Sequence, residues 1–330
     1  MANEKRRLIG DCSHLPFSKG DAKRLREFRW EKVPKIPFEL MPEADFNLRM
    51  LAGTTILEWP PVLPERDLRG VKRASEYEPA KKATAGKTGN SGNHAIRKAA
   101  NKAVTHSHHE ARILDYLELC PFVVEIRTQY PLWDRRKWGD SRSGKIPRRA
   151  TITVDIVATL RIPWQRELVY VVISVKRDDV LADKNVIRRH EKEVRLSQQW
   201  GMRHAVMTWA SIPEIESENL ARILEKIKQE PDIQTLTYPA KMLSEMLLET
   251  KAKGTMDEVL RLIGRRLGLS LDDAYTLVAV AIFLGYLEWD HRFRFDSNLP
   301  MKIRMPNNKF AILANGDADE IESTVVHIRK

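Results

Sequence analysis

The sequence predicts a mixed α/β protein followed by a helical C-terminal part. Two consecutive apolar runs, ATITVDIVATL at 150–160 and LVYVVISVK at 168–176, are rich in Val and Ile and are typical of buried strands. A helix and a strand are expected before them, and a helix, a strand and another helix after them. The order helix, three strands, helix, strand therefore indicates a sheet with helices packed against it.

Composition favours a polyanionic partner. The 330-residue chain has 56 Lys and Arg against 45 Asp and Glu, a formal net charge of +11, and nucleic acid is the leading partner for such a surplus. Cys12 and Cys120 offer neither a disulfide framework nor a metal knuckle, as expected in a reducing cytosol. No apolar run approaches a membrane span and no signal-peptide pattern begins the chain, so we expect a cytoplasmic protein with no membrane partner.

Shifts in composition divide the chain into three regions. Residues 1–69 are interpreted as an N-terminal extension, residues 70–232 as the α/β domain and residues 233–330 as a C-terminal domain. The stretch 69–102 is basic among small residues, so it either lies along a phosphate backbone or serves as a solvated linker. Its basic side chains include the four candidate DNA contacts Lys72, Arg73, Lys81 and Lys82, and further along Arg97 and Lys98.

A helix is expected at 107–119, because Ser107 and Glu110 form an S-x-x-E capping box before a periodic apolar run. Glu110 precedes the apolar positions by three, four and seven residues, so it faces inward. Either it only closes the capping box, or it reaches toward Asp155. No second ligand cluster with zinc spacing follows, so we expect flanking or solvent-exposed positions for the nearby histidines His106, His108 and His109.

Each of the two apolar runs contains a charge. Strict alternation puts the even-numbered residues of 152–158 on one face of the first strand and Asp155 on the other. In the second strand Ser174 and Lys176 share a face near the end. A carboxylate and an ammonium in such strands are costly unless they pair with each other or with a metal. The spacing is that of a metal-dependent phosphodiesterase core, and a strand-to-strand salt bridge is the alternative.

A strand and a basic loop lie between the first helix and these two strands. Residues 123–133 alternate between apolar and polar side chains, which predicts a strand. Residues 133–149 are predicted to form a basic loop that also contains aromatic residues. The loop is a candidate DNA contact, with Arg148 and Arg149 as its proposed phosphate ligands.

The elements after the second run complete the domain. Asp183 or Asn185 begins a helix that ends before Gly201. This helix carries two acidic residues, Glu191 and Glu193. A strand at 203–209 and a helix around 220–227 follow.

The C-terminal third has a different character. Thr255 and Ser270 each begin a capped helix, and the segment WDHRFRF at 289–295 alternates like a β-ribbon. Two helices and a short hairpin suggest a winged-helix-like domain. The second helix has no Lys or Arg from 271 to 287, so it is expected to form core and protein contacts rather than to read DNA.

The ordered set of these features resembles one family. The helix with Glu110, the strand with Asp155, the S-V-K of 174–176, the E-K-E of 191–193 and the phrase LCPFVVEIRTQYPL are similar to the TnsA endonucleases, subunits of heteromeric bacterial transposases. The resemblance covers about residues 70–230. It implies a restriction endonuclease-like fold with a variant PD-(D/E)xK site.

Carried over residue by residue, the resemblance implies roles for four side chains. Glu110 and Asp155 would be the metal-binding carboxylates and Lys176 the catalytic lysine. Glu193 would be an additional helix carboxylate, with Glu191 as the alternative register.

Ser174 departs from the family, which usually has Gln there, while related nucleases have Glu or Asp. A serine can still hydrogen-bond a metal-bound water. The implied cofactor is Mg²⁺, with Mn²⁺ as a substitute, held by Glu110, Asp155 and the backbone carbonyl of Val175. Lys176 would orient the attacking water or neutralise developing charge.

The resemblance also implies a reaction and partners. TnsA enzymes cleave the 5′ (non-transferred) strands at transposon ends in the bacterial cytoplasm, while the DDE transposase TnsB processes the 3′ ends. In that family the C-terminal region engages the AAA+ regulator TnsC. Two alternatives remain: a stand-alone restriction or repair endonuclease, and a DNA-binding adaptor with a decayed site.

Overall fold

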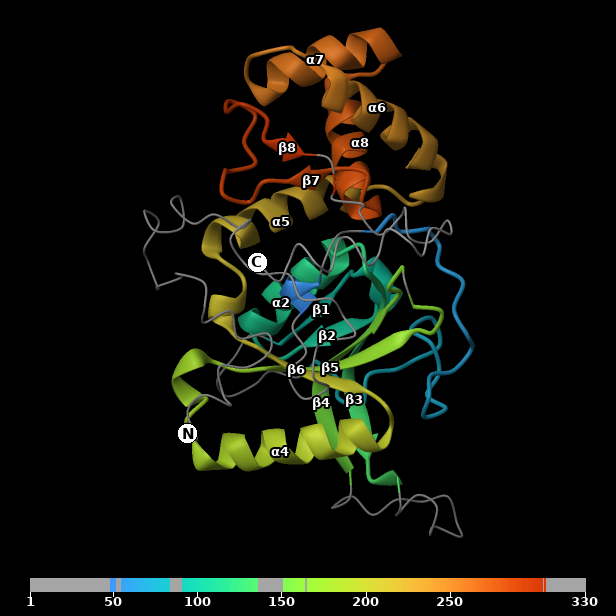
Figure 1. The fold of residues 1–330 in the computed structure, drawn as a ribbon, viewed down its shortest axis with the longest axis vertical. Coiled ribbons are helices and arrows are strands. Elements are labelled where there is room, and N and C mark those ends of the chain that lie inside the picture. Colours follow the sequence, from blue (N-terminus) through green and yellow to red (C-terminus); the bar gives the residue numbers. More distant parts are fainter. Residues whose placement is uncertain are drawn as a thin grey trace, which may run out of the picture.

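The computed structural model describes residues 48–51, 55–83, 91–135, 151–163, 165–304 and 306. Over these residues the protein is mixed α/β, with a four-stranded sheet and six α-helices (Figure 1). The predicted order of helix, three strands, helix and strand is confirmed. The elements are α2 (His108–Leu119), β3 (Val123–Trp133), β4 (Thr151–Leu160), β5 (Val169–Val175), α4 (Lys184–Gln199), β6 (Arg203–Met207) and α5 (Glu214–Lys228).

The sheet is mixed and covered on both faces. Its strand order is β3-β4-β5-β6, antiparallel except for the parallel pair of β5 and β6, which the crossover helix α4 connects. Helices α2 and α5 lie on one face and α4 lies on the other (Figure 1). Ile156 and Ile173 pack in the core beneath α2 and α5, whereas Val154, Val172 and Leu196 form a smaller cluster beneath α4.

Strand β4 does not alternate strictly. Val154 and Val157 both pack in the cluster beneath α4, whereas Ile156 packs in the opposite core. Residues three apart share a face only where the alternation slips by one position. The ladder between β3 and β4 skips Asp155 and Gln129, and Gln129 has a φ of 49°. The prediction that the even-numbered residues of 152–158 share one face is therefore wrong, and Asp155 lies at the break.

The C-terminal part consists of three helices and a short ribbon. The two helix caps predicted in this part are confirmed, with Thr255 capping α7 and Ser270 capping α8. Helix α6 was not predicted; it lacks an N-terminal cap of its own, so no local signal marked its start. The elements are α6 (Thr237–Glu249), α7 (Met256–Leu267), α8 (Leu271–Leu284), β7 (Glu288–Trp289) and β8 (Ile303–Arg304).

Helix α8 joins this part to the sheet domain. From Ala274 to Leu284 every residue except Thr276 is buried, and the helix packs against α2 and α5 as well as α6 and α7. The amide of Leu57 also donates to the Leu284 carbonyl at 2.8 Å. The predicted core role of this helix is confirmed. Within the described residues, only α7 and α8 taken together, bent by 98°, have the length and apolarity of a membrane span, and no single helix does.

The predicted ribbon at 289–295 is wrong. Strand β7 ends at Trp289, and the chain then turns, with the amide of Phe293 donating to the Asp290 carbonyl at 2.9 Å. Arg292 folds back onto the Asp290 carboxylate. Strand β7 pairs instead with the distant β8. Alternation in this segment came from a charged turn rather than from a strand.

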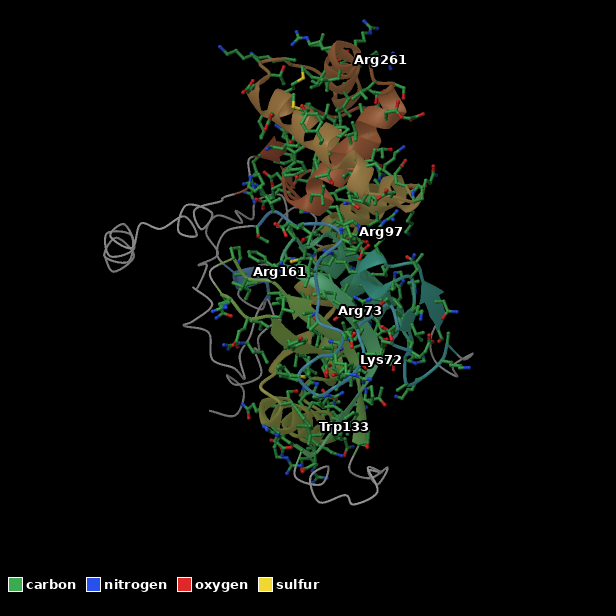
Figure 2. The ribbon with its side chains drawn as sticks, turned by 90° about the vertical axis from the view of Figure 1, so that its right-hand side faces the viewer. Lys72, Arg73, Arg97, Trp133, Arg161 and Arg261 are labelled. Carbon is green, nitrogen blue, oxygen red and sulfur yellow. The ribbon has the colours of Figure 1, made fainter. Side chains whose placement is uncertain are left out.

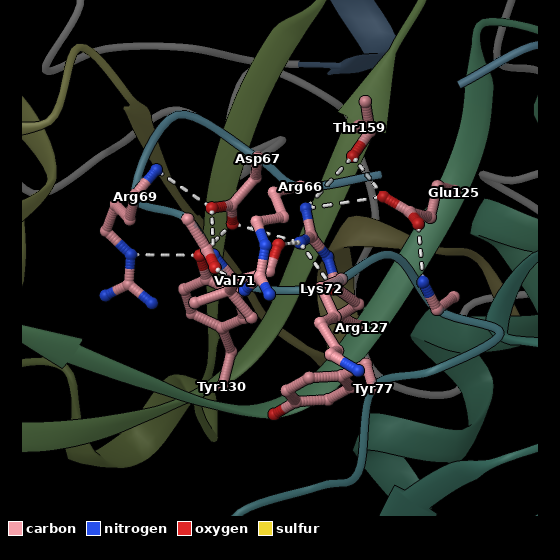
Figure 3. A network of polar contacts seen from close by, with 12 residues as sticks. Arg66, Asp67, Arg69, Val71, Lys72, Tyr77, Glu125, Arg127, Tyr130 and Thr159 are labelled. Atoms are coloured by element: carbon pink, nitrogen blue, oxygen red, sulfur yellow. Dashed lines mark hydrogen bonds and ion pairs between the residues drawn. The ribbon is translucent and has the colours of Figure 1, made fainter. Parts of the chain in front are cut away.

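Residues 48–51 and 55–69 pack into the fold, although composition had grouped them with the N-terminal extension. Leu48, Leu51 and Leu57 are buried in the main core. Asp67 and Arg69 form a polar network with two side chains of β3, Arg127 and Tyr130 (Figure 3).

Part of the basic stretch 69–102 is structural. It contains a hairpin of β1 (Gly92–His94) and β2 (Ala103–Thr105), which was not predicted. Lys98 is buried and donates to the carbonyls of Leu117 and Cys120 at 3.3 and 2.8 Å, which caps the C-terminus of α2. Burial lowers the pKa of Lys98 to about 8. Lys98 is therefore a helix cap and neither a linker residue nor a phosphate ligand.

Candidate active site

Where β5 ends beside the middle of β4, a carboxylate and an ammonium lie together. The Asp155 carboxylate accepts from the Lys176 ammonium at 3.0 Å and from the Val175 amide at 2.9 Å. Lys176 also donates to the Val175 carbonyl at 2.9 Å. Both charged side chains are 16% exposed. The pair is thus close to solvent, at the point where β4 changes the direction of its side chains.

Glu110 approaches this pair from α2. Its carboxylate accepts from the Ser107 hydroxyl at 3.1 Å, the His106 amide at 3.0 Å and the Gln129 side chain at 3.3 Å. Burial raises the pKa of Glu110, and the charge of Asp155 raises it further. Glu110 therefore both helps to fix the start of α2 and lies within electrostatic reach of Asp155, so the two sequence interpretations are compatible.

Glu193 points from α4 toward the same end of β5, but its carboxylate already accepts hydrogen bonds from three protein side chains. It is fully buried and accepts from Ser174, from Arg189 at 2.8 Å and from His204 at 3.4 Å. Burial raises its pKa, but hydrogen bonds from these three side chains outweigh burial and lower it to about 2. Glu191, by contrast, is exposed. Of the two helix carboxylates, only Glu193 faces the sheet, and it anchors Ser174.

The donor set fits a hard divalent cation with few protein ligands. Asp155 and Glu110 are the two nearby carboxylates, and the Val175 carbonyl accepts from the Lys176 ammonium that pairs with Asp155. Asp155 contributes to the raised pKa of Glu110, and a divalent cation relieves such repulsion between like charges. No cluster of three or more His, Cys, Asp or Glu residues is present among the residues that the structure describes. Mg²⁺ commonly accepts one or two carboxylates and keeps several waters.

The histidines flagged in the sequence lie beside the site. His109 and His108 pack against Trp209, with ring centroids 4.9 and 5.9 Å apart. Burial lowers the pKa of His109, which Asp178 partly offsets. The His106 ring contacts the Ser91 hydroxyl at 3.2 Å. They flank the N-terminus of α2.

The predicted DNA contacts are spread over the surface. Lys72 pairs with Glu76 at 3.0 Å, and Arg73 lies 3.9 Å from the same carboxylate. Both lie on the side of the molecule that faces the viewer in Figure 2, which is the right-hand side in Figure 1. Helix α4 begins on the left-hand side in Figure 1. Lys81 and Lys82 are exposed. Arg148 and Arg149 lie outside the described residues.

Sequence reasoning missed three side chains around the site. Gln129 holds Glu110, Arg189 bridges Glu193 and the carbonyl of Thr153 at 2.9 Å, and His190 lies on α4 close to Glu193 and Lys176. Burial lowers the pKa of His190 to about 4. The periodicity of α4 around Glu193 was the one available signal, because residues three and four apart share a helix face.

No protein-family model matches the chain, and no curated protein matches it.

Proposed function

We propose that this protein is a metal-dependent DNA endonuclease with a restriction endonuclease-like core. In this proposal it is the TnsA-like subunit of a transposase and cleaves the 5′ strands at transposon ends. The observation that carries the proposal is the meeting of Glu110, Asp155 and Lys176 from α2, β4 and β5 beside the Val175 carbonyl. Carboxylates that can hold a metal ion, next to a cation, suit metal-assisted hydrolysis of a phosphodiester.

Each residue has a task in this mechanism. Glu110 and Asp155 would hold Mg²⁺ or Mn²⁺, together with the Val175 carbonyl. The bound ion supplies Lewis acidity and lowers the pKa of a water molecule. The Lys176 ammonium, which lies 3.0 Å from Asp155, orients the attacking water or neutralises charge on the phosphate. Ser174 and Glu193 fix the end of β5 from beneath.

The partners proposed are duplex DNA, a TnsB-like DDE transposase and a TnsC-like AAA+ regulator. The topology of α6, α7, α8 and the β7–β8 ribbon supports a winged-helix-like C-terminal domain, in which α8 occupies the position of the reading helix. Because α8 is buried against α2 and α5, the exposed surface of α6 and α7 remains for the regulator. Deleting residues 233–330 would also uncover the core of the sheet domain, so point variants are the better probes.

A specific observation favours one second candidate, a DNA-binding adaptor that does not cut. Glu193 already accepts hydrogen bonds from three side chains, Ser174 stands where the family usually has Gln and related nucleases have Glu or Asp, and Asp155 already has a partner in Lys176. These features describe an ion pair that needs no metal. The experiment below separates the two candidates.

The test is cleavage of a supercoiled plasmid that carries the genomic segment around this gene. The chain is assayed with Mg²⁺ or Mn²⁺, alone and together with the proteins that the flanking genes encode. We expect 5′-strand cuts that Asp155→Asn and Glu110→Gln each reduce by at least about a hundredfold, since each removes a charge that stabilises the transition state. Glu191→Gln, on the exposed face of α4, is the matched control and keeps full activity.

Three outcomes separate the candidates. Cleavage that needs the partner proteins supports the transposase subunit, and cleavage by the chain alone supports a stand-alone endonuclease. DNA binding without cleavage under all these conditions supports the adaptor. Cleavage by Asp155→Asn at the wild-type rate contradicts the proposed site.

A further inference from the structure

Arg189 is a cation fixed beside the candidate active site. Its Nε donates to the Glu193 carboxylate at 2.8 Å, and its Nη2 donates to the Thr153 carbonyl at 2.9 Å. Both acceptors belong to rigid elements, since Glu193 is buried on α4 and Thr153 lies in β4. Two hydrogen bonds from one guanidinium hold its plane in a single orientation.

The guanidinium is nevertheless open on one side. The Arg189 side chain is 45% exposed, and its Nη1 has no hydrogen-bond partner among the residues that the structure describes. Thr153 precedes Asp155 by two residues on β4. Burial alone lowers the pKa of Arg189, but the hydrogen bond to Glu193 and the charges of Glu193 and Asp155 raise it above the ordinary value. The exposed nitrogen therefore lies within electrostatic reach of the site.

A row of further cations continues from Arg189 along α4. Arg188, Lys192 and Arg195 recur at i, i+4 and i+7, so they share one helix face. Arg188 and Arg195 are exposed, Lys192 is half-buried, and no ion pair joins any of the three to the described residues. We call these three residues the α4 basic row. The one carboxylate bordering this row on α4 is Glu191.

We infer that the α4 basic row and Arg189 bind the phosphate backbone of duplex DNA, with Arg189 contacting the phosphate nearest the cut. This inference rests on the proposed function and identifies a DNA path that the sequence did not predict. A row of cations suits a regular polyanion, because each phosphate contact releases counterions without base-specific geometry. Lys72 is less suited to this role because it is already paired with Glu76.

A matched control exists at the opposite end of the molecule. Arg261, Arg265 and Arg266 are exposed on α7, which lies at the top of Figure 1 while α4 lies at the bottom. Figure 2 shows Arg261 at the same extreme in the second view. Changing three arginines there removes the same charge from the chain as changing the α4 basic row.

The test measures binding without cleavage. A fluorescent 30-base-pair duplex of arbitrary sequence is titrated with the full chain in EDTA at several salt concentrations, and the slope of log K against log salt is compared among variants. We expect the triple variant Arg188→Gln, Lys192→Gln, Arg195→Gln to lose about 2 to 3 units of slope, at about 0.9 per phosphate contact. Arg189→Gln should lose about one unit, and Arg261→Gln, Arg265→Gln, Arg266→Gln should keep the wild-type slope.

Other results would overturn the inference. Equal losses for the two triple variants would mean that only net charge matters, and an unchanged slope for the α4 variant would put the DNA elsewhere. Displacement of the duplex by polyglutamate at a lower charge concentration than by unlabelled duplex would favour an acidic protein partner. Thermal unfolding identifies an Arg189→Gln variant that fails to fold, and the triple variant then decides alone.

This test is independent of the proposed reaction. If the α4 variant loses slope but the wild type never cuts DNA, the inference stands and the endonuclease proposal fails. If the wild type cuts DNA and the α4 slope is unchanged, the endonuclease proposal stands and the DNA path is wrong.

Discussion

Two charged clusters associated with the same sheet have different properties. In the first cluster, Asp67 and Arg69 meet Glu125 and Arg127 of β3, and both members of the Arg127–Asp67 ion pair are at most 1% exposed (Figure 3). In the second, at the end of β5 beside the middle of β4, Asp155 pairs with Lys176, and the charge of Asp155 raises the pKa of Glu110. Both side chains of the Asp155–Lys176 pair are 16% exposed. The first cluster is balanced within the protein. The second has two carboxylates, Asp155 and Glu110, for the one ammonium of Lys176.

The largest expected effect is a loss of stability when the buried cluster around Arg127 is broken. Arg127→Met should lower the free energy of unfolding by about 3–5 kcal/mol, because it leaves buried carboxylates without their cation. Arg127 donates to Asp67 at 2.9 Å and lies 3.3 Å from Glu125. Urea denaturation measures the loss. Lys72→Met, which breaks an exposed pair nearby, is the control and should change stability by less than about 1 kcal/mol. Equal effects of the two variants would remove the distinction between the clusters.

A smaller effect on stability is expected when the Asp155–Lys176 pair is broken. Asp155→Asn should destabilise the protein by no more than about 1 kcal/mol, because its ion pair with Lys176 is near solvent and Glu110 loses a repulsive neighbour. The pKa of Glu110 should fall toward its ordinary value in this variant. Carbon-detected NMR titration of Glu110 measures the shift. A Glu110 pKa that does not move would mean that the two carboxylates are not coupled.

The pH dependence of stability distinguishes a third group, His190. Burial lowers its pKa to about 4, below the value of about 6.5 in an unfolded chain. As pH falls from 6.5 to 4, the unfolded state gains a proton that the native state does not, so stability decreases across that window. His190→Gln should make this decrease shallower. His108→Gln, exposed on α2, is the control. If stability decreases between pH 6.5 and 4 as steeply in the His190 variant as in the wild type, the lowered pKa does not belong to His190.

Local signals in the sequence predicted much of the fold. The capped starts of α2, α7 and α8 and the order of the core elements follow from residues that are neighbours along the chain. The break in β4 did not, because it depends on Gln129 of another strand adopting a positive φ. Strict alternation therefore failed beside Asp155.

Charge was harder to interpret than periodicity. Lys98 and Arg97 looked like phosphate ligands, yet Lys98 caps α2 and Arg97 donates to the carbonyls of Ile227 and Glu230. Asp155 and Lys176 were singled out because each interrupts an apolar run, and Glu110 because it belongs to a capping box and shares a helix face with apolar positions. Arg189 was not, since its partners Thr153 and Glu193 lie 36 and 4 residues away and the distant one is a backbone carbonyl.

The most direct test of the difference between the clusters is a calorimetric titration of the wild-type chain with Mn²⁺. The same titration is made with Asp155→Asn, Glu110→Gln and the exposed control Glu191→Gln. If Asp155 and Glu110 hold a divalent cation, the wild type and Glu191→Gln should bind Mn²⁺ saturably. Asp155→Asn and Glu110→Gln should each bind Mn²⁺ at least about tenfold more weakly, because each loses a ligand charge. Wild-type binding by Asp155→Asn, or no binding by the wild-type chain, would contradict the claim that this site is built for a divalent cation.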